Sequence, residues 1–197
     1  MLKRFIDAFS GDGAAFMYAI VLVAAYALTI SFERGWLFWF RWRCDWESLN
    51  KSIEEKNWSE CKNLSKDHPV HTLFEHTDSL QEGKDPWDAL SCAAPQIETT
   101  VQNRLSMLSA TGSIATMLGL LGTVYGLIVA LQGLDQSNIV ERGTRLSEGI
   151  STAMITTAGG LLVGIPALAM YALLSSKANQ MLAKIESTAA RIARHKK

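Results

Sequence analysis

The sequence predicts an all-α membrane protein with three transmembrane helices. Residues 105–134 and residues 149–176 are mostly apolar and contain no charged side chain. A third apolar run without charge covers residues 13–32. A helix needs about 20 mostly apolar residues to cross the hydrocarbon core of a bilayer. Each of the three runs is therefore long enough to span a membrane.

Composition excludes some classes of partner. The chain has 197 residues, of which 48% are hydrophobic, with 19 basic and 19 acidic side chains. Because phosphate binding requires a basic excess, this balance argues against nucleic acid as the main partner. The three cysteines, Cys44, Cys61 and Cys92, are dispersed and form no C-x-x-C pair. We expect a reducing compartment and no disulfide framework.

The N-terminal part combines a polar segment with the first span. Residues 1–12 carry apolar side chains at helical spacing, which is typical of a short helix lying in the membrane interface; a frayed terminus is the alternative. Residues 13–40 form the first predicted transmembrane helix, which we interpret as an uncleaved anchor. Tryptophans at its end suit the headgroup zone; they are Trp36, Trp39 and Trp42.

The basic residues that flank the spans predict the orientation. Arginines follow the first span and precede the second, and six lysines and arginines follow the third. This places residues 41–104 and the tail in the cytoplasm, with the N-terminus and the hairpin 135–148 outside.

The segment 41–104 is predicted to be a cytoplasmic helical domain. Since a proline is tolerated in a first helical turn, we expect Pro95 to start a long helix that runs without a break into the second span, 105–134. The third span, 149–176, is expected to continue as a cytoplasmic C-terminal helix over 177–197.

Small residues recur at helical spacing in both late spans and predict close helix packing. In lipid, small side chains on one stripe allow two backbones to approach closely. The glycines expected to pack in this way are Gly119, Gly122, Gly126, Gly160 and Gly164.

Four threonines lie among these small residues, namely Thr123, Thr152, Thr156 and Thr157. A threonine hydroxyl in a helix can bond to the carbonyl three or four residues earlier, and this reading stays open for each of them. Their concentration in two adjacent helices favours a hydrated seam, in which these hydroxyls can order water or line an ion pathway.

We find no catalytic motif, and we predict no enzymatic activity, no cofactor and no metal site. Neither late span contains an ionisable Asp, Glu, Lys, Arg or His. Proton relays in membranes normally use an ionisable group, and threonine does not titrate near neutral pH. If the protein conducts protons, the titrating carboxylate must come from another chain.

The segment GLLGTVYGLIVAL, followed by GISTAMITTAGGLLVGIPALAMY, resembles the paired-helix signature of the MotA/TolQ/ExbB proton-channel family. The resemblance is densest over residues 105–176. MotA-type proteins place two spans before their cytoplasmic domain, whereas this chain has one, so the ExbB/TolQ branch fits better.

The resemblance implies a homo-oligomeric ring, a pentamer in this branch, in the bacterial inner membrane. It also implies an ExbD/TolR-like single-span partner that supplies a membrane aspartate. Proton flow is then expected to energise transport or another envelope process, with a TonB-like or TolA-like protein as a further partner. By motif match, Thr123 and Thr157 fall on the pore-facing threonines of the family, and Pro166 falls on its third-span proline.

One departure from the family pattern concerns a glutamate in a motif like GI-x-E-A, where this chain has Thr152. We interpret the nearby Glu148 as a helix-start residue. A hydroxyl-rich site suits sodium as well as protons, so a sodium-driven motor stays an alternative. A non-conducting oligomeric membrane scaffold is another.

Overall fold

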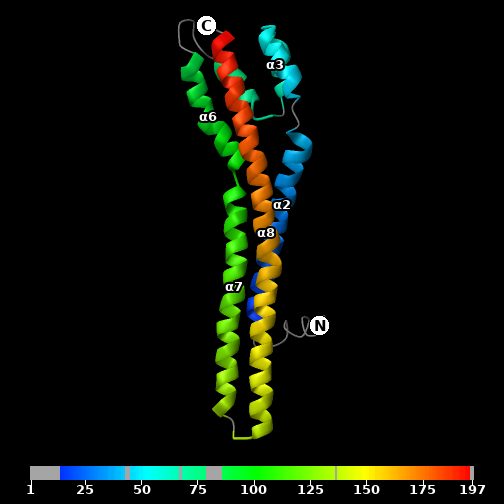
Figure 1. Ribbon diagram of the computed structural model, residues 1–197, viewed down its shortest axis with the longest axis vertical. Helices are drawn as coiled ribbons and strands as arrows, with labels where there is room; N and C mark the ends of the chain where they lie inside the picture. The colour runs from blue at the N-terminus through cyan, green and yellow to red at the C-terminus, as the bar shows by residue number, and fades with distance from the viewer. Residues whose placement is uncertain (1–13, 43–44, 67, 79–85, 136, 196–197) are drawn as a thin grey trace. The chain divides into compact units, whose positions relative to one another are not determined.

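In the computed structural model, all regular structure in the described residues is helical (Figure 1). The described residues are 14–42, 45–66, 68–78, 86–135 and 137–195. The helix predicted over residues 1–12 lies outside them. Three described helices are long and apolar enough to cross a membrane, which confirms the predicted number of spans.

The first of these helices is α2 (Ala14–Trp36), which continues into a π-helical turn, η1 (Leu37–Arg41). The second is α7 (Leu105–Gln132), and the third is α8 (Ile139–His195), a single helix that passes through Pro166. Residues 139–148, which we expected in the hairpin, are thus helical. The side-chain oxygen of Asn138 accepts the Val140 N–H at 3.0 Å and caps α8 at its start.

The chain divides into two compact units. The first comprises residues 1–31 and 106–171, and in it α7 and α8 run side by side in opposite directions, joined by η2 (Gly133–Asp135) and a short turn (Figure 1). The buried side chains between them are small. They include Ala115, Ala130, Ala153 and Ala167.

The second unit comprises residues 32–105 and 172–197. It contains α3 (Trp46–Glu54), α4 (Trp58–Ser65), α5 (His71–Asp78) and α6 (Pro86–Gln102), together with the C-terminal part of α8. Apolar side chains from these helices form its core, among them Leu49, Ile53, Leu73, Phe74, Ile97 and Ile192. The Asp45 carboxylate caps α3 by accepting from the N–H groups of Glu47 and Ser48.

The C-terminal part of α8 contacts the rest of the second unit through three basic side chains that are spaced by seven residues and lie on one helix face. Lys177 Nζ lies 4.2 Å from the centre of the Trp39 ring, and Lys184 Nζ lies 5.7 Å from that of Trp46. Arg191 pairs with Glu54 at 3.3 Å. The basic residues that predicted orientation therefore also make cation–π and ionic contacts within the chain.

The prediction of one continuous helix from Gln96 into the second span is wrong. Helix α6 begins at Pro86, contains Pro95 in its interior and ends at Gln102, and α7 begins at Leu105. Pro86 thus takes the helix-start role that we assigned to Pro95. Arg104, in the link between the helices, has a φ of 64°, a left-handed conformation that a continuous helix does not contain.

Candidate functional site

Helices α7 and α8 meet along a seam of glycines at backbone contact. A Cβ added at Gly126 would lie 2.6 Å from the main-chain nitrogen of Ala153, and one at Gly160 would lie 2.7 Å from the main-chain oxygen of Ala115. A Cβ at Gly122 or Gly164 would collide with the hydroxyls of Thr156 or Thr116, respectively. Gly119 faces the Cα of Gly160. Only glycine fits this spacing, because any side chain would push the two helices apart.

Thr157 is the threonine that links the two helices directly. Its hydroxyl donates a hydrogen bond to the main-chain oxygen of Gly119 at 3.1 Å, across the seam. The side chain is only partly buried. Since the hydroxyl proton is used by Gly119, the oxygen lone pairs are left to accept from water or to coordinate a cation.

The other seam threonines bond to their own helix. Thr123 donates to the carbonyl of Leu120, and Thr116 donates to that of Gly112 at 3.0 Å. Both are partly exposed. Thr156 donates to the carbonyls of Thr152 and Ala153, at 2.9 and 3.0 Å, and is completely buried against α7. Thr152 itself is partly exposed. The four threonines singled out from the sequence thus lie in different environments.

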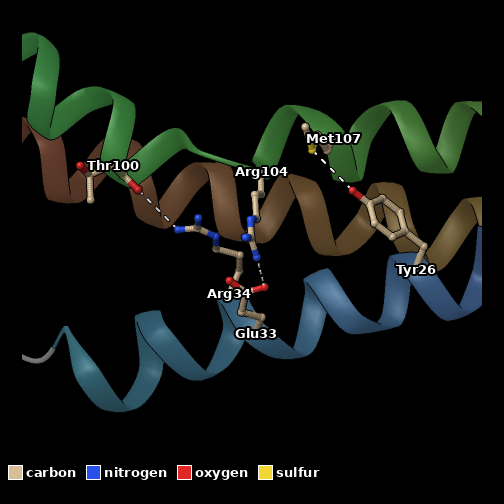
Figure 2. Close-up of polar contacts among 6 residues, drawn as sticks. All are labelled: Tyr26, Glu33, Arg34, Thr100, Arg104 and Met107. Atoms are coloured by element: carbon tan, nitrogen blue, oxygen red, sulfur yellow. Dashed lines mark hydrogen bonds and ion pairs between the residues drawn. The ribbon is translucent and has the colours of Figure 1, made fainter.

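Contacts with α2 show which side of α7 is covered. The ring centroids of Tyr125 and Phe16 lie 5.3 Å apart. The Met107 sulfur accepts a hydrogen bond from the Tyr26 hydroxyl at 3.5 Å (Figure 2). Met107 and Tyr125 are about five turns apart and lie on one face of α7.

Thr116 and Thr123 lie on the other side of α7. Thr123 is two residues from Tyr125, about 200° around the helix, and Thr116 is nine residues away, about 180° around it. The hydroxyl side of α7 therefore points away from α2 within this unit. Because the seam bond brings Thr157 to Gly119, between the levels of Thr116 and Thr123, three hydroxyl oxygens follow one another along this side.

Thr116 was missed in the sequence analysis. It lies seven residues before Thr123, which returns it to nearly the same face of the helix. That spacing is the signal that could have identified it.

An open pocket of about 390 Å³ lies near the start of α8, lined by Val140, Glu141, Thr144, Arg145 and Glu148. Glu148 is exposed and lies well inside α8, whereas Glu141 is the acidic residue of the first turn. Our interpretation of Glu148 as a helix-start residue is therefore wrong. Its carboxylate instead lines this pocket, one helical turn before Thr152. We call the pocket the polar mouth.

Among the described residues, no cluster of three or more His, Cys, Asp or Glu side chains could hold a metal ion. Cys61 is fully buried, and burial raises the pKa of its thiol. This environment disfavours the thiolate that metal binding and nucleophilic chemistry need. The polar chemistry of the seam rests on hydroxyl and carbonyl oxygens.

Residues 63–187 match the model of the family described as the MotA/TolQ/ExbB proton channel family. The match includes the end of α4, all of α5, α6 and α7, and α8 as far as residue 187, and therefore the whole seam. It covers more than half of the chain.

Several individual proteins that are similar to this chain have ExbB or TolQ names. The chain is 43% identical over 84 residues to the biopolymer transport protein exbB1 of Vibrio cholerae. The aligned region covers 43% of this chain and 37% of that protein. It is 29% identical over 195 residues to the putative biopolymer transport protein ExbB-like 1 of Synechocystis, covering 91% of this chain and 74% of that protein. The Tol-Pal system protein TolQ of Haemophilus influenzae is 33% identical over 94 residues, 46% of this chain and 40% of that protein.

Proposed function

Because the chain belongs to the MotA/TolQ/ExbB proton channel family, in its ExbB/TolQ-like branch, we propose that it is the ring-forming subunit of a proton-driven motor in the bacterial inner membrane. The ring is a homo-oligomer, proposed to be a pentamer. Its N-terminus is periplasmic and its C-terminus is cytoplasmic.

The observation that carries this proposal is the row of hydroxyl oxygens along the side of α7 that points away from α2. The hydroxyls of Thr116, Thr123 and Thr157 all donate to main-chain carbonyls, so their oxygens present acceptor lone pairs. A row of acceptors suits water molecules that relay protons. We assign Thr123 and Thr157 to the ion pathway and add Thr116.

The remaining predicted pathway residues take different roles in this proposal. Thr156 is a packing residue, since it is completely buried against Gly122 and its hydroxyl bonds to its own helix. Thr152 lies near the polar mouth that contains Glu148 and lets water reach the pathway. Pro166 corresponds, by resemblance, to the third-span proline of the family, and we assign it no role in the ion pathway.

The row of threonine hydroxyls contains no titrating group, so the partner must supply one. No Asp, Glu, Lys, Arg or His occurs in residues 105–134 or 149–176. A proton relay in a membrane needs an ionisable side chain. We propose that an ExbD/TolR-like single-span protein places its membrane aspartate beside these hydroxyls, and that the resulting motion energises transport through a TonB-like or TolA-like protein.

Proton flux into proteoliposomes tests the proposal. The chain and a single-span candidate partner with a membrane aspartate are reconstituted separately and together, and flux is followed with a pH-sensitive dye under a potassium diffusion potential. We expect flux from the complex and none when the partner aspartate is changed to asparagine. Flux that requires sodium would identify the sodium-driven alternative. A stable complex without flux of either ion would identify a scaffold and contradict the proposal.

A further inference from the structure

The link between α6 and α7 has a backbone conformation that its own sequence does not favour. Asn103 still donates to the Thr99 carbonyl at 2.9 Å, as in a continuing helix. Arg104 then adopts a φ of 64°. A non-glycine residue in the left-handed region is disfavoured, because its Cβ crowds the following carbonyl oxygen.

Nothing in the local sequence requires this break. There is no proline between Pro95 and the start of α7 at Leu105, and no glycine at position 103 or 104. Local propensity alone therefore permits one continuous helix through the link. The contacts that stabilise the break must come from elsewhere in the chain.

Two neighbouring residues of α2 make those contacts, all within the second unit (Figure 2). The Glu33 carboxylate forms an ion pair with the Arg104 guanidinium. Arg34 Nη1 donates to the carbonyl of Thr100 at 3.4 Å, one of the last four carbonyls of α6, which lack partners within an α-helix.

Arg34 is buried at this position. Its side chain is 5% exposed, and its Nε is buried without a hydrogen-bond partner. A cation beside a helix C-terminus interacts favourably with the partial negative charge there. If α6 continued into α7, the Thr100 carbonyl would accept from the main chain of residue 104, and Arg34 would lose its acceptor.

We propose that the α6–α7 link is a two-state joint, held in its broken form by Glu33 and Arg34. When these contacts are released, the link becomes helical and α6 and α7 join into one helix. The first membrane helix thereby controls the backbone of the link that leads into the second. This proposal does not depend on ion conduction.

Hydrogen exchange followed by mass spectrometry tests the proposal on the full chain in lipid nanodiscs. In the broken form the amides of residues 105–108 begin a helix and lack intrahelical acceptors, so they exchange quickly. In the double variant Glu33→Gln/Arg34→Met we expect these amides to exchange about tenfold more slowly, since a continuous helix supplies their acceptors. Adding Arg104→Gly should restore fast exchange, because glycine adopts positive φ freely.

The matched control is Glu54→Gln, which removes the ion pair with Arg191 in the same unit and should leave the amides of residues 105–108 unchanged. Unchanged exchange in the double variant would overturn the proposal, since the break would then be intrinsic to the link. Faster exchange throughout residues 99–108 would also overturn it, because the contacts would merely prevent fraying.

Discussion

Thr157 of α8 donates its hydroxyl hydrogen bond to the main-chain oxygen of Gly119 of α7, 3.1 Å away. This bond is possible only because glycines bring the two helices to backbone contact. The neighbouring Thr156, in contrast, donates to its own helix. The Thr157 hydroxyl therefore combines a structural contact between the helices with an oxygen that can still accept a hydrogen bond.

Replacing that hydroxyl should separate conduction from assembly. Thr157→Val keeps the side-chain shape and removes the acceptor oxygen, so we expect proton flux of the reconstituted complex to be lost. The lost hydrogen bond costs about 1 kcal/mol, which leaves the fold intact. The measurement is flux together with oligomer mass.

Thr29→Val is the matched control for this experiment. Thr29 is a membrane-helix threonine whose exposed hydroxyl bonds back to the Ala25 carbonyl at 2.8 Å on α2. The complex that contains the Thr29→Val variant should conduct protons normally. Normal flux from Thr157→Val would remove Thr157 from the pathway.

The glycine seam makes a prediction about stability. Gly126→Ala places a Cβ 2.6 Å from the Ala153 nitrogen, and such overpacking costs about 1–3 kcal/mol. Gly143→Ala, on the same pair of helices, meets no atom within 4 Å and should stabilise by about 0.5–1 kcal/mol through helix propensity. Unfolding by sodium dodecyl sulfate, followed by circular dichroism, measures both. Equal effects of the two substitutions would refute backbone contact at Gly126.

His68 predicts how the second unit responds to pH. Its side chain is 5% exposed, Nδ1 accepts from the Val70 N–H at 3.1 Å, and Nε2 is buried without a partner. Burial lowers the pKa of His68 from 6.5 to about 4. The unfolded chain therefore binds this proton at higher pH than the folded chain does.

The stabilising effect of neutral His68 is fully present above pH 6.5 and is lost as the pH falls towards 4, by about 3 kcal/mol in total. Hydrogen exchange of α3 to α5, corrected for the intrinsic effect of pH, measures this loss. In His68→Asn the side chain can still accept from the Val70 N–H but does not titrate, so the dependence should flatten. A wild-type protein with no loss of protection between pH 6.5 and 4 would disprove the assigned burial.

Much of the fold could be predicted because membrane spans follow from local composition. The charge-free runs correspond to α2, α7 and the central part of α8, and the glycine spacing identifies the seam. These features depend on one helix at a time or on two that are adjacent in sequence. The environments of individual threonines could not be predicted, because one residue along a helix changes the direction by about 100°.

The α6–α7 break could not be predicted for a different reason. Local propensity through residues 99–108 permits a helix, and the contacts that favour the break come from Glu33 and Arg34, far away in the sequence. The position of Glu148 was misjudged because Asn138 starts α8 earlier than the apolar pattern does. In both cases polar residues outside the apolar runs decide the helix ends.

Disulfide crosslinking to the single-span partner tests the central claim most directly. In a chain whose native cysteines are replaced, one cysteine is placed at Thr123 or at Leu121, an exposed residue about 200° away on α7, and a second beside the membrane aspartate of the partner. The hydroxyl side should face that aspartate, so Thr123→Cys should crosslink and Leu121→Cys should not. Crosslinking from Leu121→Cys alone would show that the hydroxyl row faces away from the titrating group.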